Sequence, residues 1–284
     1  MVFLLNLAPA AGQVTPFERV TISAAKAGQN LLVNMGIPLS AVAAQTDNPE
    51  ELLSISLGSA ETTLLNLTSA YSSFVNGGKL ISPIIIDRIQ DSEGNTIINN
   101  ENRKCINCDK ISYTGKDYPQ IEDNYEQVMS EQTAYQVTTI LEGVIKRGTG
   151  KKLRDLQLNL AGKTGTTNEN TDAWFIGFTS NLVIGVYVGM DNPKPLGKFE
   201  TGSKTALPIF ENFIKKAVKK SDARPFKVSQ GITMMVVDSS TGQKASLTSK
   251  NTIMEAYKSK NVVDGKVLYS NNDRLDSNNI LKFY

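Results

Sequence analysis

Residues 156–189 constrain the fold of this chain more than any other stretch. Residues 156–160 alternate leucine with polar residues and lead directly into Gly-Lys-Thr-Gly at 162–165, which predicts a half-buried strand carrying this tetrapeptide. Two further apolar runs, at 173–179 and 182–189, predict two more strands. Their connection is so short that the pair must be antiparallel, because parallel strands need a long crossover. We therefore expect an antiparallel sheet in this part of the chain.

Two helices are expected before this sheet. The first runs from about residue 16, where proline suits a first helical turn, to about residue 33. The second follows a turn at 58–63 and ends at Asn-Gly-Gly, residues 76–78, because glycine accepts the left-handed conformation that ends helices. Its apolar stripe, at helical spacing, consists of Leu64, Leu67, Tyr71 and Phe74.

Two more helices flank the sheet in the sequence. Ser130 can N-cap a third helix, with Val137, Leu141 and Val144 on its buried face, and a Gly-Thr-Gly segment ends it. A final helix is expected at 205–219. Helices, then antiparallel strands, then a helix indicate an α+β fold class rather than an alternating α/β class.

A hairpin and a polar loop are expected between the second and third helices. Residues 84–98 predict a β-hairpin with its turn at 91–95, and residues 99–125 predict a long surface loop containing Cys105 and Cys108. This Cys-x-x-Cys spacing fits half a zinc site, a redox pair or a local disulfide. We favour a structural or incidental role, because a zinc site would need further ligands from a second chain or from carboxylates.

Arg224 and Pro225 mark a predicted boundary. We divide the chain into an irregular segment at 1–15, a partial domain at 16–222, and a small β-containing extension at 223–284 that is partly ordered and partly disordered. A strand at 232–237 is the main element expected in that extension.

Composition excludes several classes of function. The chain has 284 residues and no histidine, so a Ser-His-Asp triad, a Cys-His pair and a histidine metal site are all excluded, and we expect no cofactor and no metal site. A formal net charge of +2, without a long basic block, does not favour nucleic acid as a partner. The apolar start of the chain is too short to span a membrane and lacks the basic region of a signal peptide.

The tetrapeptide at 162–165 has the chemistry of a carboxylate-binding strand. The ammonium of Lys163 supplies positive potential, and the hydroxyls of Thr164 and Thr166 can donate hydrogen bonds to a carboxylate. Gly165 has no side chain, so a substrate can lie against the strand edge. A backbone N–H just beyond it can face a developing oxyanion.

Eight segments in order carry a family resemblance. They are residues 57–64, 70–78, 89–94, 145–150, 161–167, 172–177, 185–191 and 201–210. Together they resemble the C-terminal part of the transpeptidase domain of class A, 1A-type penicillin-binding proteins, in which Lys-Thr-Gly is one of three motifs of a penicillin-reactive serine site. The resemblance implies a penicillin-binding or serine β-lactamase-like fold, with an antiparallel sheet flanked by helices.

The resemblance also implies roles for five residues. Lys163 and Thr166 are the expected catalytic residues, and the backbone N–H of Thr166 is expected in the oxyanion hole. Thr164, Gly165 and Thr167 are expected to bind the substrate.

The chain departs from the family pattern near its start. Where the family has Ser-x-Asn, this chain has Pro-Phe-Glu at 16–18, and too few residues precede it for the usual nucleophile region. Ser23 and Lys26 fit the Ser-x-x-Lys spacing and would share one helical face, which makes Ser23 a candidate nucleophile, but they lie where the family has a different helix. We therefore expect an N-terminally truncated fragment without the glycosyltransferase domain of class A members.

The resemblance implies part of a peptidoglycan D,D-transpeptidase, which cross-links D-Ala-D-Ala stem peptides by serine acyl transfer. The alternatives are a non-catalytic remnant that lacks the nucleophile, and a β-lactamase or D,D-carboxypeptidase. Expected partners are stem peptides, β-lactams and a companion chain that carries the missing serine. The implied location of the parent enzyme is the periplasmic face of the bacterial inner membrane.

Overall fold

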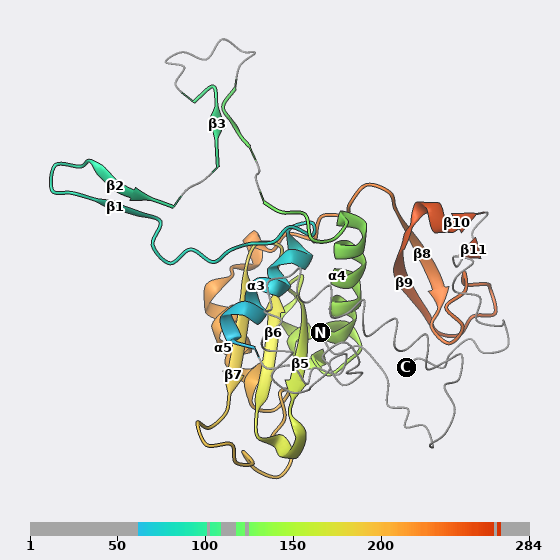
Figure 1. The fold of residues 1–284 in the computed structure, drawn as a ribbon. Coiled ribbons are helices and arrows are strands. Elements are labelled where there is room, and N and C mark those ends of the chain that lie inside the picture. Colours follow the sequence, from blue (N-terminus) through green and yellow to red (C-terminus); the bar gives the residue numbers. More distant parts are fainter. Residues whose placement is uncertain (1–61, 101–102, 109–117, 123–124, 264–265, 268–284) are drawn as a thin grey trace, which may run out of the picture.

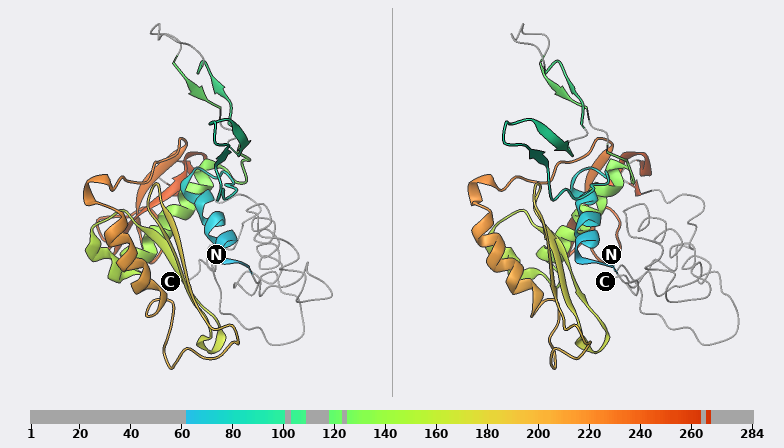
Figure 2. Two further views of the ribbon diagram at one scale, coloured as in Figure 1. Left: turned by 90° about the vertical axis from the view of Figure 1, so that its left-hand side faces the viewer. Right: turned by 60° about the vertical axis from the view of Figure 1, so that its left-hand side comes forward.

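A three-stranded antiparallel sheet forms the centre of the computed structural model, which describes residues 62–100, 103–108, 118–122, 125–263 and 266–267 (Figure 1). The strands are β5 (Ala161–Thr166), β6 (Ala173–Phe178) and β7 (Val183–Val188), in the order β5-β6-β7. Helices α3 (Leu64–Val75) and α4 (Glu131–Lys146) cover one face, and α5 (Ala206–Ala217) covers the other, as the turned views show (Figure 2). The α+β class and the antiparallel pair at 173–189 are confirmed.

Alternating side chains of β6 divide the core into two clusters. Ile176 and Phe178 pack with α3 and α4, while Ala173 and Phe175 pack with α5, so β6 is covered on both faces. The ring of Phe175 meets that of Phe210 from α5 at 4.8 Å between centroids. Two-sided burial explains why β6 reads as a continuous apolar run rather than an alternating one.

The predicted ends of the two helices on one face are confirmed. The side chain of Thr63 caps α3 by accepting from the N–H of Asn66 at 3.1 Å, and Gly77, at φ +83°, follows its last turn. Ser130 caps α4 by accepting from the N–H of Thr133 at 3.2 Å.

The buried face predicted for α4 needs a correction. Of its three predicted residues only Leu141 is fully buried, whereas Val137 and Val144 are partly exposed. The fully buried positions also include Ala134, Thr138, Gly143 and Ile145. The buried face of α4 thus contains small and polar residues as well as Leu141 and Ile145. Such residues fit there because α3 and β5 approach the helix closely.

The strand predicted at 156–160 is wrong. Residues Lys151–Leu156 form the short 3₁₀ helix η3, Gln157 is left-handed at φ 56°, and the strand begins at Ala161. Leu156 at the end of η3, and Leu158 and Leu160 in the loop after it, pack on the α5-side cluster, so their alternation reflects burial without strand pairing. Further 3₁₀ turns are η4 (Asn168–Asn170), η5 (Lys220–Asp222) and η6 (Ser259–Asn261).

Two antiparallel ladders project from the body between α3 and α4 (Figure 1). Strands β1 (Arg88–Gln90) and β2 (Thr96–Asn99) confirm the predicted hairpin, although its first strand starts four residues later than the isoleucine run suggests. The expected polar loop contains a short ladder of β3 (Cys105–Ile106) and β4 (Gln120–Ile121). Cys105 and Cys108 form a disulfide there, one of the three arrangements that their spacing allowed.

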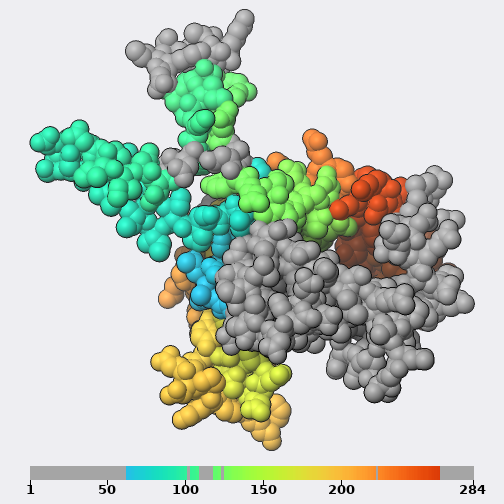
Figure 3. Space-filling view, viewed as in Figure 1, coloured from blue at the N-terminus to red at the C-terminus, as the bar shows by residue number. Residues whose placement is uncertain are grey.

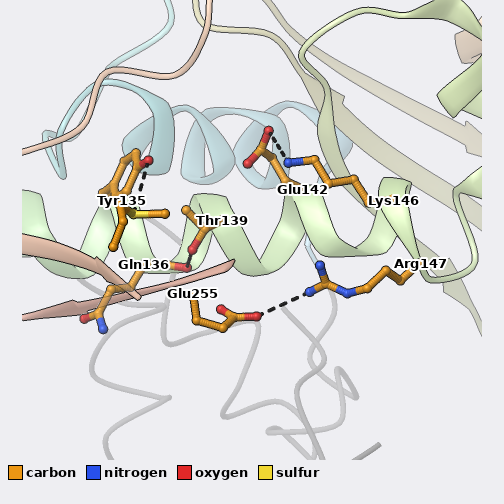
Figure 4. A network of polar contacts seen from close by, with 8 residues as sticks. Tyr135, Gln136, Thr139, Glu142, Lys146, Arg147 and Glu255 are labelled. Carbon is orange, nitrogen blue, oxygen red and sulfur yellow. Dashed lines mark hydrogen bonds and ion pairs between the residues drawn. The ribbon is translucent and has the colours of Figure 1, made fainter. Parts of the chain in front are cut away.

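A two-stranded ribbon docks against α4 near the end of the described chain. Strand β8 (Ile232–Asp238) confirms the strand predicted there, and it pairs with β9 (Thr252–Lys258), which was not predicted. A minor ladder of β10 (Val262–Val263) and β11 (Lys266–Val267) follows. Figure 4 shows the contact with α4, where Arg147 approaches Glu255 at 3.3 Å. The amide of Gln136 also donates to the carbonyl of Ala256 at 2.9 Å.

None of the helices in the described ranges is long and apolar enough to cross a membrane. The helix predicted at 16–33, most of the turn at 58–63, and the candidate nucleophile Ser23 with Lys26 lie outside the described residues.

Candidate functional site

The residues predicted to form a site are carried together by β5. Strand β5 pairs with β6 in a regular register that sets Lys163 opposite Ile176, Thr164 opposite Phe175, and Thr166 opposite Ala173. Directly opposed side chains share a face, so Thr164 and Thr166 lie on the α5 side and Lys163 lies on the α3 and α4 side.

The outer edge of β5 is free of strand pairing within the described residues, because β5 ends the three-stranded order. The backbone N–H of Thr167 donates to the carbonyl of Asp172 at 3.2 Å, so this pair faces inward. Inward and outward groups alternate along an antiparallel strand. The N–H and C=O groups of Thr164 and Thr166 therefore point away from β6, to the open edge.

The ammonium of Lys163 lies at this same edge. Its Nζ donates a hydrogen bond of 2.9 Å to the carbonyl of Thr164, which points outward. The side chain is half-buried, and this burial lowers the pKa of Lys163 from its usual 10.5 by removing water from the charged form. A partly desolvated cation beside an open edge favours an incoming anion.

Both threonine hydroxyls on the α5 side are held by neighbours. The Thr164 hydroxyl lies 2.9 Å from that of Thr149, in the loop after α4. The Thr166 hydroxyl accepts from the backbone N–H of Gly202 at 3.0 Å, which leaves its own proton free to donate. The two oxygens are thus oriented before any ligand arrives.

Gly202 lies directly over the backbone of β5 and β6. A Cβ atom at this position would collide with the carbonyl oxygens of Gly165 and Trp174. Only glycine permits this approach. The loop before α5 contacts Thr166 at this glycine.

Thr167 is placed differently from the other predicted residues. It follows the end of β5, and its hydroxyl contacts that of Thr171 at 2.7 Å and accepts from the N–H of Asp172 at 2.8 Å. Its hydroxyl serves the turn between β5 and β6, and its role in substrate binding stays a prediction.

A second layer supports β6 behind the site. Trp174, the one tryptophan of the chain, lies opposite Gly165 and packs its ring against that of Tyr187 at 4.6 Å. The Tyr187 hydroxyl donates to Asp172 at 2.8 Å, and this hydrogen bond raises the pKa of Tyr187. Trp174, on β6 opposite Gly165, is therefore an optical probe next to the strand that carries the site.

Sequence reasoning missed the supporting roles of Thr149 and Gly202. Each lies in a short glycine-containing segment, Gly-Thr-Gly at 148–150 and Thr-Gly-Ser at 201–203, that contributed to the family resemblance. Both residues are far from β5 in sequence, so their contacts with it could not be predicted from local spacing. The glycines in these two segments, one after a helix and one before a helix, do indicate a close approach of the backbone to a neighbour.

Comparisons with known proteins agree on one family. A family model described as "Penicillin binding protein transpeptidase domain" matches residues 25–215. Penicillin-binding protein 1A of Rickettsia felis is 39% identical over 234 residues, covering 81% of this chain and 29% of that protein. Penicillin-binding protein 1A of Neisseria flavescens is 33% identical over 229 residues, covering 78% of this chain and 27% of that protein.

Solved structures show the same fold. The crystal structure of penicillin-binding protein 1A from Haemophilus influenzae has a TM-score of 0.68 and 26% identity, covering 88% of this chain and 39% of that one. The penicillin-binding protein PonA1 from Mycobacterium tuberculosis has a TM-score of 0.56 and 20% identity, covering 72% of this chain and 53% of that one. The chain thus spans well under half the length of the 1A proteins it matches.

Proposed function

This chain belongs to the family of penicillin-binding protein transpeptidase domains, and we propose that the outer edge of β5 binds the terminal carboxylate of a D-Ala-D-Ala stem peptide for serine acyl transfer. The same edge would bind the carboxylate of a β-lactam. PonA1 has been solved in complex with penicillin V, which supports this assignment by analogy of fold.

One observation carries the proposal: an ammonium and two pre-oriented hydroxyls follow one another along an open strand edge. The Nζ of Lys163 lies at the edge, and the Thr164 and Thr166 hydroxyls are held by Thr149 and Gly202. Charge-assisted hydrogen bonds of this kind are about twice as strong as neutral ones and suit a carboxylate.

The outward N–H of Thr166 is placed to stabilise the oxyanion that forms during acyl transfer. In the reaction, a serine oxygen attacks the carbonyl carbon of the penultimate D-alanine, and negative charge develops on the carbonyl oxygen. A backbone N–H already directed at that oxygen stabilises the charge without reorganising. The amide bond then breaks, and terminal D-alanine leaves with the proton that the serine hydroxyl lost. An amine of a second peptide attacks the ester carbonyl of the acyl-enzyme, the ester bond breaks, and the serine oxygen regains a proton from that amine.

The nucleophilic serine of this reaction has two candidates. Ser23, with Lys26 as its base, is one candidate, and a serine from a companion chain is the other. The match to a transpeptidase domain over residues 25–215 supports a transpeptidase over a β-lactamase or D,D-carboxypeptidase. We place this activity at the periplasmic face of the bacterial inner membrane, as expected of 1A-type proteins.

The carboxylate-binding step has a direct test. We would titrate the full chain with acetyl-Lys-D-Ala-D-Ala and with the same peptide ending in a carboxamide, following Trp174 fluorescence. The carboxylate peptide should bind at least about tenfold tighter, because the amide loses the charge-assisted hydrogen bonds. Lys163→Met should remove the difference, with exposed Lys194→Met as the matched control. Equal binding of acid and amide by the native chain would overturn the proposal.

The acylation step is tested separately. The chain is incubated with a fluorescent penicillin, denatured and weighed by mass spectrometry. One adduct per chain is expected if its own serine acts, and peptide mapping then tests Ser23. An adduct that forms only after a partner chain is added would assign the serine to that partner. A folded chain that binds the carboxylate peptide but forms no adduct under either condition would reject acyl transfer and restrict the function to binding.

A further inference from the structure

An exposed aromatic ring between two lysines lies in the loop that joins β7 to α5. Phe199 is 62% exposed, so its ring is open to solvent. The ammonium of Lys198 lies 5.3 Å from the centre of this ring, and that of Lys204 lies 5.5 Å from it. We name Lys198, Phe199 and Lys204 the Phe199 cluster.

The backbone holds this ring in a strained conformation. Phe199 has φ +70°, a left-handed value that bulky residues rarely adopt. Such strain persists only where the surroundings impose it, and it concentrates at functional sites. Two hydrogen bonds hold the loop on either side of Phe199. On the N-terminal side, the N–H of Leu196 donates to the carbonyl of Asn170 at 2.9 Å. On the other side Gly202 is bound to Thr166.

The cluster lies beside the proposed carboxylate site. Gly202 follows Phe199 by three residues, and three residues span at most about 10 Å of extended chain. The loop and the turn after β5 lie together at one end of the molecule in all three views of the ribbon and in the space-filling view (Figure 3). A peptide bound along the edge of β5 therefore reaches the cluster within a few residues.

No described acidic residue pairs with the two lysines of the cluster. Within the described part of the chain, neither Lys198 nor Lys204 forms a salt bridge. The nearest acidic residue in sequence, Glu200, accepts a hydrogen bond from the Thr205 hydroxyl. Two ammonium groups beside one ring, without an acidic partner among the described residues, form a local site of positive potential next to an apolar surface.

We propose that the Phe199 cluster binds a second carboxylate of the substrate, so that this chain prefers D-Ala-D-Ala peptides that carry an acidic side chain upstream. The two ammonium groups would pair with that carboxylate, and the Phe199 ring would pack against the aliphatic part of the acidic residue. The proposal rests on the carboxylate site at β5 and adds a second anchor to it.

The test compares two peptides that differ by one group. We would titrate the full chain with acetyl-Glu-Lys-D-Ala-D-Ala and acetyl-Gln-Lys-D-Ala-D-Ala at 20 mM and 300 mM salt. The Glu peptide should bind about threefold to tenfold tighter at low salt, as expected for two partly exposed ion pairs. High salt should reduce this preference.

Variants assign the preference to the cluster. Lys198→Gln combined with Lys204→Gln should abolish the preference and leave the affinity for the Gln peptide unchanged. Lys194→Gln changes an exposed lysine of the same loop that is not one of the two lysines over the ring, and it is the control for the loss of a single charge. Phe199→Asn, which tolerates the left-handed backbone, should weaken binding of both peptides.

The two proposals fail in different ways. Equal binding of the two peptides by the native chain, or a preference that survives the double lysine variant, would overturn the second anchor and leave the β5 site intact. Failure of the native chain to bind either peptide would overturn the β5 site and the second anchor with it.

Discussion

At the scale of single residues, Lys163 combines a charge with partial burial. Its ammonium donates to the Thr164 carbonyl, and burial holds its pKa below the usual 10.5. The folded chain therefore binds this proton less tightly than the unfolded chain does. The cost of the buried charge is present at neutral pH and disappears as the pH rises toward 10.5, so the stability contributed by this group rises across that window.

Binding of the carboxylate peptide should depend on pH through the same residue. Affinity should be constant near neutral pH and should fall as the pH rises through the lowered pKa of Lys163, earlier than an ordinary lysine would lose its proton. Lys163→Arg keeps its charge over this range and should give a flat profile. Isothermal titration between pH 7 and pH 11 measures both. A native profile that matches the arginine profile would contradict the role of the ammonium.

Thr149 should act through Thr164 without touching the substrate. Thr149→Val keeps the shape and removes the hydroxyl that lies 2.9 Å from the Thr164 hydroxyl. One lost neutral hydrogen bond is worth about 0.5–1.5 kcal/mol, so affinity for D-Ala-D-Ala peptides should fall about twofold to tenfold. Thr149→Ser should restore it. Loss of affinity in both variants would indicate a packing role in place of hydrogen bonding.

At the scale of elements, the loop before α5 depends on its contact with β5. Gly202 makes that contact by lying against the carbonyl oxygens of Gly165 and Trp174, where no side chain fits. The loop thereby positions both the Thr166 hydroxyl and the Phe199 cluster.

Gly202→Ala should separate the loop from the strand. The added methyl group collides with rigid backbone, so we expect a loss of about 1–3 kcal/mol in unfolding free energy and weaker binding of both test peptides. Urea unfolding and Trp174 fluorescence measure the two effects. Ser203→Ala, one residue further along, removes a contact with the Thr201 hydroxyl and should have little effect on either.

The ribbon of β8 and β9 should make stability depend on pH. Desolvation raises the pKa of Glu255 above 4.5, and the nearby charge of Arg147 opposes part of that rise. The folded state therefore holds this proton more tightly, so the contribution of Glu255 is greatest below pH 4.5 and is lost as the pH rises through the raised pKa.

Glu255→Gln isolates this effect. The Tm of the native chain, relative to that of Glu255→Gln, should fall as the pH rises from about 4 to 7. Calorimetry at four pH values is sufficient. A relative Tm that rises over this range would show that the pair with Arg147, at 3.3 Å, outweighs desolvation.

At the scale of the whole molecule, one sheet separates two cores, and a linker fastens the ribbon to one of them. Phe226, between α5 and β8, packs its ring on that of Phe178 at 5.7 Å, within the cluster of α3 and α4. The boundary proposed at 222–223 therefore falls just before a residue that joins the two parts.

Phe226→Ala should lower the stability of the whole unit. The ring is partly buried, so we expect about 2 kcal/mol, which is about 4–8 °C in Tm for a unit of 150–250 residues. A single transition should be retained. Val228→Ala, at a side chain that is 50% exposed, is the control. A second transition that shifts alone would show that 223–284 unfolds independently and would support the predicted domain division.

Local chemistry in the sequence was sufficient for several elements. Glycine stops and serine or threonine caps act within a few residues, so the ends of α3 and α4 could be predicted. The hairpin turn at 91–95 and the short connection of β6 to β7 are equally local. By contrast, the alternating leucines at 156–160 predicted a strand, whereas burial on the α5-side cluster gives the same pattern at the end of a 3₁₀ helix and in the loop after it.

The motif and its order among the other elements could be read from residue type and short spacing, which are local properties of the chain. The groups that orient the motif could not be found this way, because the fold brings them together from distant parts of the sequence. Thr149 and Gly202 lie 15 and 36 residues from their hydroxyl partners, and only the fold brings them within 2.9 and 3.0 Å. Hydrogen bonds act over about 3 Å of space whatever the separation along the chain. Nor does spacing along one strand reveal which edge is open, since that depends on which strands pair.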